Sequence, residues 1–300
     1  MEPSYLAFSS KELEIRAEKC WELLKSCRIC PRHCGVNRLK DERRGFCQMG
    51  INPKIYSFHP HFGEENCLVG VGGSGTIFFS SCNLACVYCQ NYEISQLKEG
   101  EEVKIEDLGR IMISLQNKGC HNINLVSPTI WVPQIIKAVI IAREKGLNLP
   151  LVYNTGGYDL PSALRFLEGI VDIYMPDIKY SDNKVGLKYS LVSDYWTIVR
   201  EAVKEMHRQV GDLIIKNGLV VRGLLIRHLV LPNGIAGTKK VMKFIASLSK
   251  DSYINIMDQY YPTNKAHLYP ELNRRITLEE FFEAIKIAKN FDLYRFADGG

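Results

Sequence analysis

The chain has 300 residues, of which 46% are hydrophobic and 24% are charged. A chain of this length and composition can bury a large core, which excludes fibrous, disordered and small disulfide-stapled proteins. Its formal net charge of +5 is too small for a dedicated nucleic-acid-binding protein. The unusual feature is the cysteine content, because nine of the ten cysteines lie between residues 20 and 89.

The cysteines indicate metal binding rather than disulfides. Residues 1–5 lack the basic stretch and apolar run of a secretion signal. The longest apolar stretch, 125–142, is interrupted by two prolines, a glutamine and a lysine, whereas a membrane span needs about 20 mostly apolar residues. We therefore expect a soluble, cytoplasmic protein that has no membrane partner and whose thiols stay reduced.

The first predicted element is a helix over 11–26, where apolar side chains recur at helical spacing. A Cys- and Arg-rich stretch without periodicity follows, up to about residue 53. Seven basic and two acidic residues within 27–54 account for the whole net charge of +5. We divide the chain into a helix and Cys/Arg-rich module over 1–71 and a main domain over 72–300.

From residue 72 onward, short apolar strands alternate with amphipathic helices. The strands are expected over 76–79, 123–126, 151–153, 171–174, 224–231 and 254–257. The helices are expected over 105–118, 133–145, 161–168, 195–210, 239–249 and 278–290. This alternation predicts an α/β fold of parallel strands covered by helices, either a barrel or an open doubly wound sheet. Six units are too few for a closed eight-stranded barrel. Asn217-Gly218, between two apolar runs, predicts a hairpin over 213–222.

Three cysteines directly follow the first strand of the main domain. Cys82, Cys86 and Cys89 have the spacing C-x3-C-x2-C and lie at the carboxyl end of that strand, where βα barrels place their chemistry. A [4Fe–4S] cluster takes four ligands, so three cysteines leave one iron open. Zinc needs a fourth ligand nearby, and no Cys or His occurs in the next 30 residues. We expect an iron–sulfur cluster, with a zinc site or three buried thiols as alternatives.

A second set of four cysteines lies in the amino-terminal module. Cys27, Cys30, Cys34 and Cys47 provide a complete ligand set for a structural zinc ion and equally for an auxiliary [4Fe–4S] cluster. A polar stretch without periodicity can gain its order from such a metal. We expect a second metal here, with zinc as the first candidate and iron–sulfur as the second; buried thiols are the alternative.

The basic residues around this quartet have three interpretations. They can neutralise the thiolates, bind an acidic partner or an RNA backbone, or form a solvated face. The remaining cysteines, Cys20, Cys67 and Cys120, are expected in the core. Residues 70–75 match G-x-G-x-x-G, but they precede a strand instead of following one, so we reject a dinucleotide site.

The spacing of Cys82, Cys86 and Cys89 resembles the signature of the radical S-adenosylmethionine (SAM) superfamily. Within it, the chain resembles a less-characterised branch of homologues of pyruvate formate-lyase activating enzyme. The segments that carry this resemblance span nearly the whole chain: 27–38, 89–91, 125–129, 153–158, 175–179, 227–233 and 255–260.

The resemblance implies a partial (β/α)6 barrel of the TIM type that binds SAM through its amino and carboxylate groups at the open iron. An electron from the cluster would cleave SAM to methionine and a 5′-deoxyadenosyl radical, which removes hydrogen from a substrate. Such chemistry requires a dry, closed pocket. The resemblance also implies an electron donor such as flavodoxin or ferredoxin.

The resemblance assigns roles to polar residues at the ends of the predicted strands. Residues 127–129 occupy the place of a glycine-rich segment that holds the SAM amino group, although Ile130 stands where homologues often have His. Asn154 and residues 175–179 match segments that place a small cation and SAM-contacting groups beside the cluster, although relatives have Asp in place of Asn154. The cofactor-binding candidates are Asn91, Ser127, Thr129, Asn154, Asp177, Lys179, Arg227 and Gln259.

Two of these assignments concern particular chemistry. Arg227 is the candidate for pairing with the SAM carboxylate, and Lys179 and His228 are the candidate catalytic residues. The alternatives are structural: Asp177 and Lys179 as a surface ion pair, His228 as a core histidine with both nitrogens bonded, and Asn154 as a turn residue.

The sequence therefore predicts a radical SAM oxidoreductase that abstracts hydrogen from an unidentified substrate, in the manner of the enzymes that activate glycyl-radical enzymes. A non-catalytic iron–sulfur or zinc protein that serves in electron transfer or docks RNA is the alternative from another class. A radical SAM enzyme that modifies RNA or a peptide is a third. The substrate is accordingly a protein, a peptide or an RNA.

Overall fold

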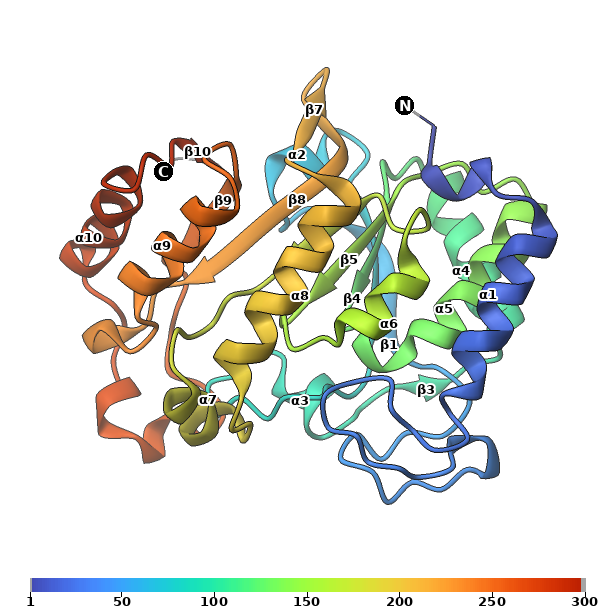
Figure 1. The fold of residues 1–300 in the computed structure, drawn as a ribbon, viewed down its shortest axis with the longest axis horizontal. Coiled ribbons are helices and arrows are strands. Elements are labelled where there is room, and N and C mark those ends of the chain that lie inside the picture. The colour runs from blue at the N-terminus through green and yellow to red at the C-terminus, as the bar shows by residue number, and fades with distance from the viewer. Residues whose placement is uncertain (1, 298–300) are drawn as a thin grey trace.

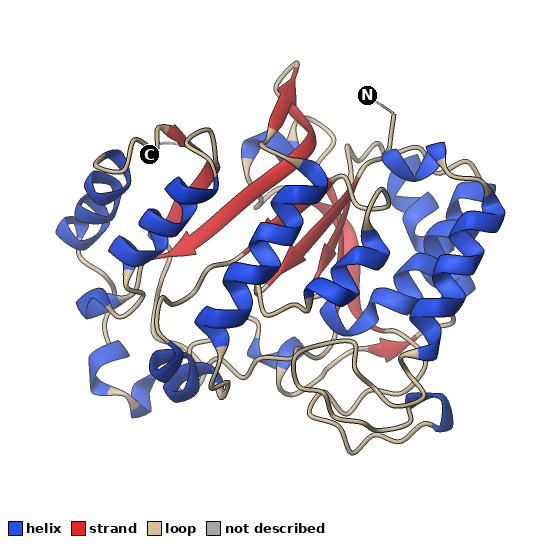
Figure 2. Cartoon of the chain, in the orientation of Figure 1, coloured by secondary structure: helices blue, strands red, loops and turns tan. Residues whose placement is uncertain are grey.

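A sheet of mainly parallel strands forms the centre of the protein, and helices cover it (Figures 1 and 2). The computed structural model describes residues 2–297. Six neighbouring strands run parallel in the order β2–β4–β5–β6–β8–β9, and β10 continues the row. They are β2 (Ser74–Phe79), β4 (Ile123–Val126), β5 (Leu151–Thr155), β6 (Ile173–Pro176), β8 (Leu219–Leu229), β9 (Tyr253–Met257) and β10 (Arg295–Phe296).

Each step from one parallel strand to the next passes through at least one helix. The connecting helices are α4 (Ile105–Asn117), α5 (Val132–Glu144), α6 (Pro161–Leu164), α7 (Asn183–Ser190), α8 (Tyr195–Val210), α9 (Thr238–Leu248) and α10 (Leu278–Lys289). The row of strands ends at β3 on one side and at β10 on the other, so the sheet does not close. This confirms the expected α/β fold of six βα units in a partial barrel.

The carboxyl ends of the parallel strands face one end of the molecule. In Figure 1 this end carries the short helix α3 (Tyr92–Ser95), α7 and the loops of the amino-terminal module. The opposite end carries the short helix α2 (Asn66–Val69) and the hairpin that begins with β7 (Ile214–Lys216). Parallel βα folds place ligands at the carboxyl ends of their strands, so the end with α3 and α7 is where a site is expected.

The first helix, α1 (Ser10–Glu22), is capped at its start by neighbouring side chains and packs on the barrel. The Ser9 side chain accepts a hydrogen bond from the Glu12 amide, and the Ser9 amide donates one to the Glu12 carboxylate. Leu13 and Ala17 are buried on one face, toward α5. The helix is shorter than the predicted 11–26, because residues 23–27 form turns.

The sequence analysis missed a strand, β1 (Lys54–His61), which pairs antiparallel with β2 and with the two-residue β3 (Glu101–Glu102). Pro60 and four polar side chains interrupt its pattern, and a strand near the edge of a sheet tolerates them. By sequence β1 belongs to the predicted 1–71 module, yet it extends the sheet of the main domain. The division at residues 71/72 stays a prediction.

Other differences are smaller. β6 begins two residues later than expected, and the predicted helix 161–168 is α6 followed by a 3-10 turn over Arg165–Leu167. The helices α2, α3 and α7 were not expected. The hairpin is confirmed: Asn217 and Gly218 have φ of 52° and 80°, the conformation that a two-residue hairpin turn requires.

A buried arginine fixes the amino-terminal module to the barrel. Arg38 is fully buried, and its guanidinium donates to the Gly50 carbonyl at 2.9 and 3.0 Å and to the Ile130 carbonyl at 2.6 Å. It also lies over the Trp131 ring. Arg43 pairs with Asp41 and Glu102. Arg38 is therefore used inside the protein, whereas Arg28, Lys40, Arg43 and Arg44 are exposed.

Candidate active site

A cleft of about 380 Å³ lies at the carboxyl ends of the parallel strands. It collects most of the predicted site residues, although they are spread over nearly 180 positions of the sequence. Those that line it are Cys82, Cys86, Cys89, Asn91, Ser127, Asn154, Asp177, Lys179, Arg227 and Gln259. The fold thus brings the cysteine triad and a set of charged and amide side chains to one place.

The loop that carries the triad is fixed by bonds to its neighbours. Ser81 adopts a left-handed conformation with φ of 70°, and its amide donates to the Ile94 carbonyl in α3. Further along the loop, the amides of Ala85 and Val87 donate to the Ser190 and Tyr189 carbonyls at 3.2 and 2.8 Å. The turn after β2 is therefore held between α3 and α7, which positions the cysteines before any ligand binds.

Each thiol of the triad has a polar neighbour. The Cys86 sulfur lies 3.0 Å from the Ser190 hydroxyl, and the Cys89 sulfur lies 3.2 Å from the Ser95 hydroxyl. The Leu84 amide donates to the Cys82 sulfur at 3.4 Å. Hydrogen bonds to sulfur help to tune an iron–sulfur cluster.

Cys86 is buried, Cys82 and Cys89 are half-buried, and the three thiols influence one another's pKa values. Burial raises the pKa of Cys82 to about 12, and the nearby Cys86 and Cys89 add to this. Burial also raises the pKa of Cys86, although Lys179 opposes it. Such thiols ionise when a metal centre supplies positive charge.

The donor set fits a four-iron cluster with one open iron. No three Cys, His, Asp or Glu side chains within residues 2–297 converge closely enough to hold a single metal ion. The three cysteines line the cleft together, and no fourth cysteine lines it. This arrangement matches a cluster that keeps one coordination position for a ligand.

Buried ion pairs form one wall of the cleft. Asp177 accepts from Lys179 Nζ at 2.6 Å and from Arg227 Nε at 2.8 Å, and all three side chains are only 17% exposed. Burial alone would raise the pKa of Asp177, but Arg227 and Lys179 outweigh it and hold that pKa below its ordinary value. Asp177 is therefore an anion between two cations and not part of a surface ion pair.

Arg227 connects this wall to the floor of the cleft. Its Nη2 donates to Asn154 Oδ1 at 2.7 Å, and its Nη1 lies 3.3 Å from Glu64 Oε2. Burial would lower the pKa of Arg227, but Asp177, Glu65 and Glu64 raise it. Asn154 also has a defined role here, as a partner of the arginine rather than as a turn residue alone.

Sequence reasoning missed Glu64. It follows β1 and enters the cleft from the floor, where Asn124 Nδ2 and Asn154 Nδ2 lie 3.0 and 3.4 Å from its Oε1. Burial raises the pKa of Glu64, although Arg227 opposes this. The sequence analysis did not predict β1, so it also gave no reason to expect that the loop after β1, which carries Glu64, reaches the cleft.

Two of the predicted cofactor-binding and catalytic residues do not line the cleft. Thr129 is buried, and its hydroxyl lies 3.1 Å from the hydroxyl of Thr155, which does line the cleft. His228 is fully buried: its Nδ1 donates to the Ile178 carbonyl at 2.7 Å, and its Nε2 accepts from the Thr238 hydroxyl at 3.0 Å. This placement matches the structural alternative for His228.

The buried histidine predicts a loss of stability in acid. Burial lowers the pKa of His228 from 6.5 to about 4, so the unfolded chain binds a proton at a higher pH than the folded one. Stability is therefore lost as the pH falls from about 6.5 to about 4, by about 3 kcal/mol from this residue. Free energies of unfolding measured across this range should fall less steeply for His228→Gln than for the wild type. Equal slopes would contradict the assignment.

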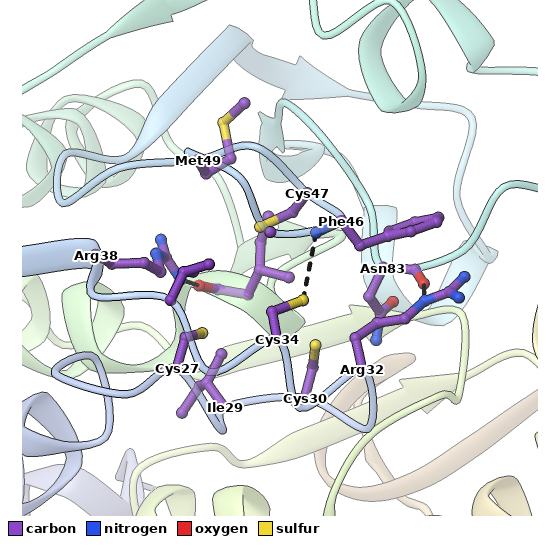
Figure 3. Close-up of a pocket in the computed structure, with 13 residues that line it drawn as sticks. Cys27, Ile29, Cys30, Arg32, Cys34, Arg38, Phe46, Cys47, Met49 and Asn83 are labelled. Atoms are coloured by element: carbon purple, nitrogen blue, oxygen red, sulfur yellow. Dashed lines mark hydrogen bonds between the residues drawn. The ribbon is translucent and has the colours of Figure 1, made fainter. Parts of the chain in front are cut away.

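The amino-terminal cysteines line a separate, small cavity. Figure 3 shows Cys27, Cys30, Cys34 and Cys47 around one space, with Asn83 of the triad loop at its side. The Phe46 amide donates to the Cys34 sulfur at 3.3 Å. The structure thus separates the seven candidate metal-binding cysteines into the two sets expected from their spacing. The three other cysteines are buried, and no disulfide joins any of the ten, all of which lie in the described chain.

Comparisons with known proteins agree with this site. A family model described as the radical SAM superfamily matches residues 76–225, which include the triad and most of the cleft. The uncharacterized protein MJ0674 of Methanocaldococcus jannaschii is 33% identical over 292 residues, covering 94% of this chain and 79% of that protein.

Solved structures show the same fold at low identity. A radical SAM methyltransferase from Sphaerobacter thermophilus has a TM-score of 0.50 at 13% identity, covering 75% of this chain and 67% of that one. The FeFe-hydrogenase maturase HydG from Carboxydothermus hydrogenoformans also has a TM-score of 0.50, at 12% identity, covering 71% of this chain and 49% of that one. With the family model matching half of the residues, the chain belongs to the radical SAM superfamily.

Proposed function

We propose that this chain holds a [4Fe–4S] cluster on Cys82, Cys86 and Cys89 and cleaves SAM reductively in the cleft beside them. One observation carries the proposal: the three thiols share a single cleft with the Asp177, Lys179 and Arg227 network. When bound, the cluster and SAM supply a 5′-deoxyadenosyl radical that takes a hydrogen atom from the substrate. The residues of the chain bind, orient and shield these groups.

Arg227 is the group that we assign to the SAM carboxylate. Its contact with Glu64, at 3.3 Å, is longer than those with Asp177 and Asn154, at 2.8 and 2.7 Å. Nη1 is therefore the nitrogen that can most easily exchange its present partner, Glu64, for a ligand. Guanidinium–carboxylate pairing is strong and directional. Asp177 and Asn154 keep the arginine in place while it does so.

Polar groups around Arg227 can hold the rest of the ligand. Ser127 ends β4 in a left-handed conformation with φ of 59°, and its amide donates to the Asn154 carbonyl at 2.9 Å. This turn brings Ser127 into the cleft beside Asn154. At the rim, Gln90 Nε2 donates to the Gln259 carbonyl at 3.1 Å, which ties the triad loop to the segment after β9. We propose Lys179 as the catalytic residue. It is the cation nearest to Asp177, and its charge opposes the rise in the pKa of Cys86 that burial causes.

The finer parts of the proposal concern activity type and partners. We propose hydrogen abstraction of the kind carried out by enzymes that activate glycyl-radical enzymes, on a protein, peptide or RNA substrate. The reductant is flavodoxin or ferredoxin, and the protein works in the cytoplasm, where thiols stay reduced. No helix among residues 2–297 combines the length and apolarity that a membrane crossing needs. We also propose that the amino-terminal cysteine quartet binds a second metal centre.

The test is SAM cleavage by the cluster-loaded protein. Reconstituted anaerobically, reduced with dithionite and given SAM, the protein should release 5′-deoxyadenosine and methionine in equal amounts. A fully loaded protein that binds SAM but releases no 5′-deoxyadenosine would contradict the proposal. A loaded protein that binds no SAM would instead favour the non-catalytic binding protein.

A further inference from the structure

We infer that Cys27, Cys30, Cys34 and Cys47 hold a second [4Fe–4S] cluster and not a zinc ion. The inference goes beyond the proposed function, which leaves the identity of this metal open, and it does not depend on SAM cleavage. It reverses the order of the two candidates drawn from the sequence, where the ligand count alone suits both metals.

The four thiols lie farther apart than the ligands of a single zinc ion do. The four cysteines line a cavity of about 10 Å³, enough to admit one water-sized sphere at its centre. A zinc ion binds sulfur at about 2.3 Å, which draws four sulfurs together and leaves no such space. Nowhere in residues 2–297 do three potential ligands converge closely enough to hold one metal ion. The quartet thus surrounds a space wider than a zinc site.

The surroundings suit a buried anionic centre. Figure 3 shows the cysteines facing the cavity from the segments around Cys27–Cys34 and Cys47. The Phe46 amide donates to the Cys34 sulfur at 3.3 Å, and the backbone amides of Arg32 and Met49 oppose the rise in pKa that burial causes at Cys30 and Cys47. Hydrogen bonds of this kind stabilise thiolates and set the reduction potential of a cluster.

Apolar side chains and two guanidinium groups complete the lining. Ile29, Val36, Met49 and Ile130 surround the thiols and limit the access of water. Arg38, fully buried, and Arg32 lie at the cavity and offset the negative charge of the thiolates. One Nη of Arg32 is buried and has no hydrogen-bond partner, although the Arg32 Nε donates to the Asn83 carbonyl at 2.9 Å. The Arg32 guanidinium carbon lies 3.6 Å from the centre of the Phe46 ring, so its positive charge is held beside the cavity.

The quartet lies directly against the triad loop. The Ser81 hydroxyl donates to the Cys47 carbonyl at 2.9 Å, and Asn83 lines the quartet's cavity. These two residues flank Cys82, so the backbone that carries the first triad ligand is held from the quartet side. Occupancy of the quartet should therefore help to fix the triad loop.

The deciding experiment removes the triad and leaves the quartet. A triple variant, Cys82→Ala/Cys86→Ala/Cys89→Ala, is reconstituted with iron and sulfide in the presence of equimolar zinc, and its metal and acid-labile sulfide are measured. We expect about four irons and four sulfides per chain, and an EPR signal after reduction that added SAM does not change. One zinc per chain without acid-labile sulfide would overturn the inference.

A second measurement covers the case in which the triple variant does not fold. The wild-type protein should then bind about eight irons per chain, whereas a zinc quartet would give about four irons and one zinc. Cys20→Ala is the matched control, because Cys20 is a buried thiol outside both sets and its loss should not change the iron content. Eight irons without SAM cleavage would contradict the proposed function and leave this inference standing.

Discussion

Replacing Cys86 with Ala is expected to abolish SAM cleavage. The Cys86 sulfur is buried in the cleft beside Ser190, so its loss removes one of only three ligands and leaves no cysteine in position to replace it. Disturbing a partner of a metal ligand already costs about 10–100-fold in metal affinity or activity, and losing the ligand itself should cost more. The release of 5′-deoxyadenosine should fall at least about 100-fold, together with the cluster absorbance assigned to the triad.

Two controls separate this effect from general damage. Cys120→Ala removes another buried thiol that lies outside the cleft and should leave the 5′-deoxyadenosine yield unchanged. Ser190→Ala keeps the ligand and removes only its hydroxyl neighbour, so the cluster should form with an altered EPR spectrum. Full activity in the Cys86→Ala protein would contradict the role of the triad.

Replacing Arg227 with Met is expected to cause the largest loss of stability among the cleft residues. The substitution leaves Asp177 with only Lys179 and leaves Glu64 without its cation, both in a buried setting. Removing one partner of a buried ion pair costs about 3–5 kcal/mol, because the remaining charge is uncompensated. The free energy of unfolding from denaturant titration should fall by that amount, and SAM binding should be lost with it.

Arg43 provides the matched control. It also pairs with two carboxylates, those of Asp41 and Glu102, but its side chain is 42% exposed. Solvent screens such a pair, so Arg43→Met should change the free energy of unfolding by at most about 1 kcal/mol. Similar losses in the two variants would show that burial of the Arg227 network does not determine its contribution.

The fold and the main ligands could be predicted because local patterns determine them. The alternation of apolar strands and amphipathic helices predicted six parallel βα units, and the structure contains them. The cysteine spacings predicted two separate sets, and the structure places them in two neighbouring cavities. Positions such as Asp177 and Arg227 were assigned from the resemblance to the superfamily, and their places at the carboxyl ends of parallel strands supported the assignment.

The remaining features depend on contacts that a linear pattern does not contain. β1 has a proline and polar side chains, and it forms because β2 offers it an open edge. Glu64 then reaches the cleft only because β1 returns the chain beneath the barrel. Arg38 looked like part of a basic face, but tertiary contacts with Gly50 and Ile130 bury it. Each of these residues is positioned by partners far away in the sequence.

The most direct test of the central claim is whether SAM changes the electronic environment of the triad cluster. The reconstituted, dithionite-reduced protein is examined by EPR with and without saturating SAM. SAM should alter one cluster signal of the wild-type protein by binding at the open iron, and it should have no effect on the Cys82→Ala/Cys86→Ala/Cys89→Ala variant. Identical wild-type spectra with and without SAM would contradict the account.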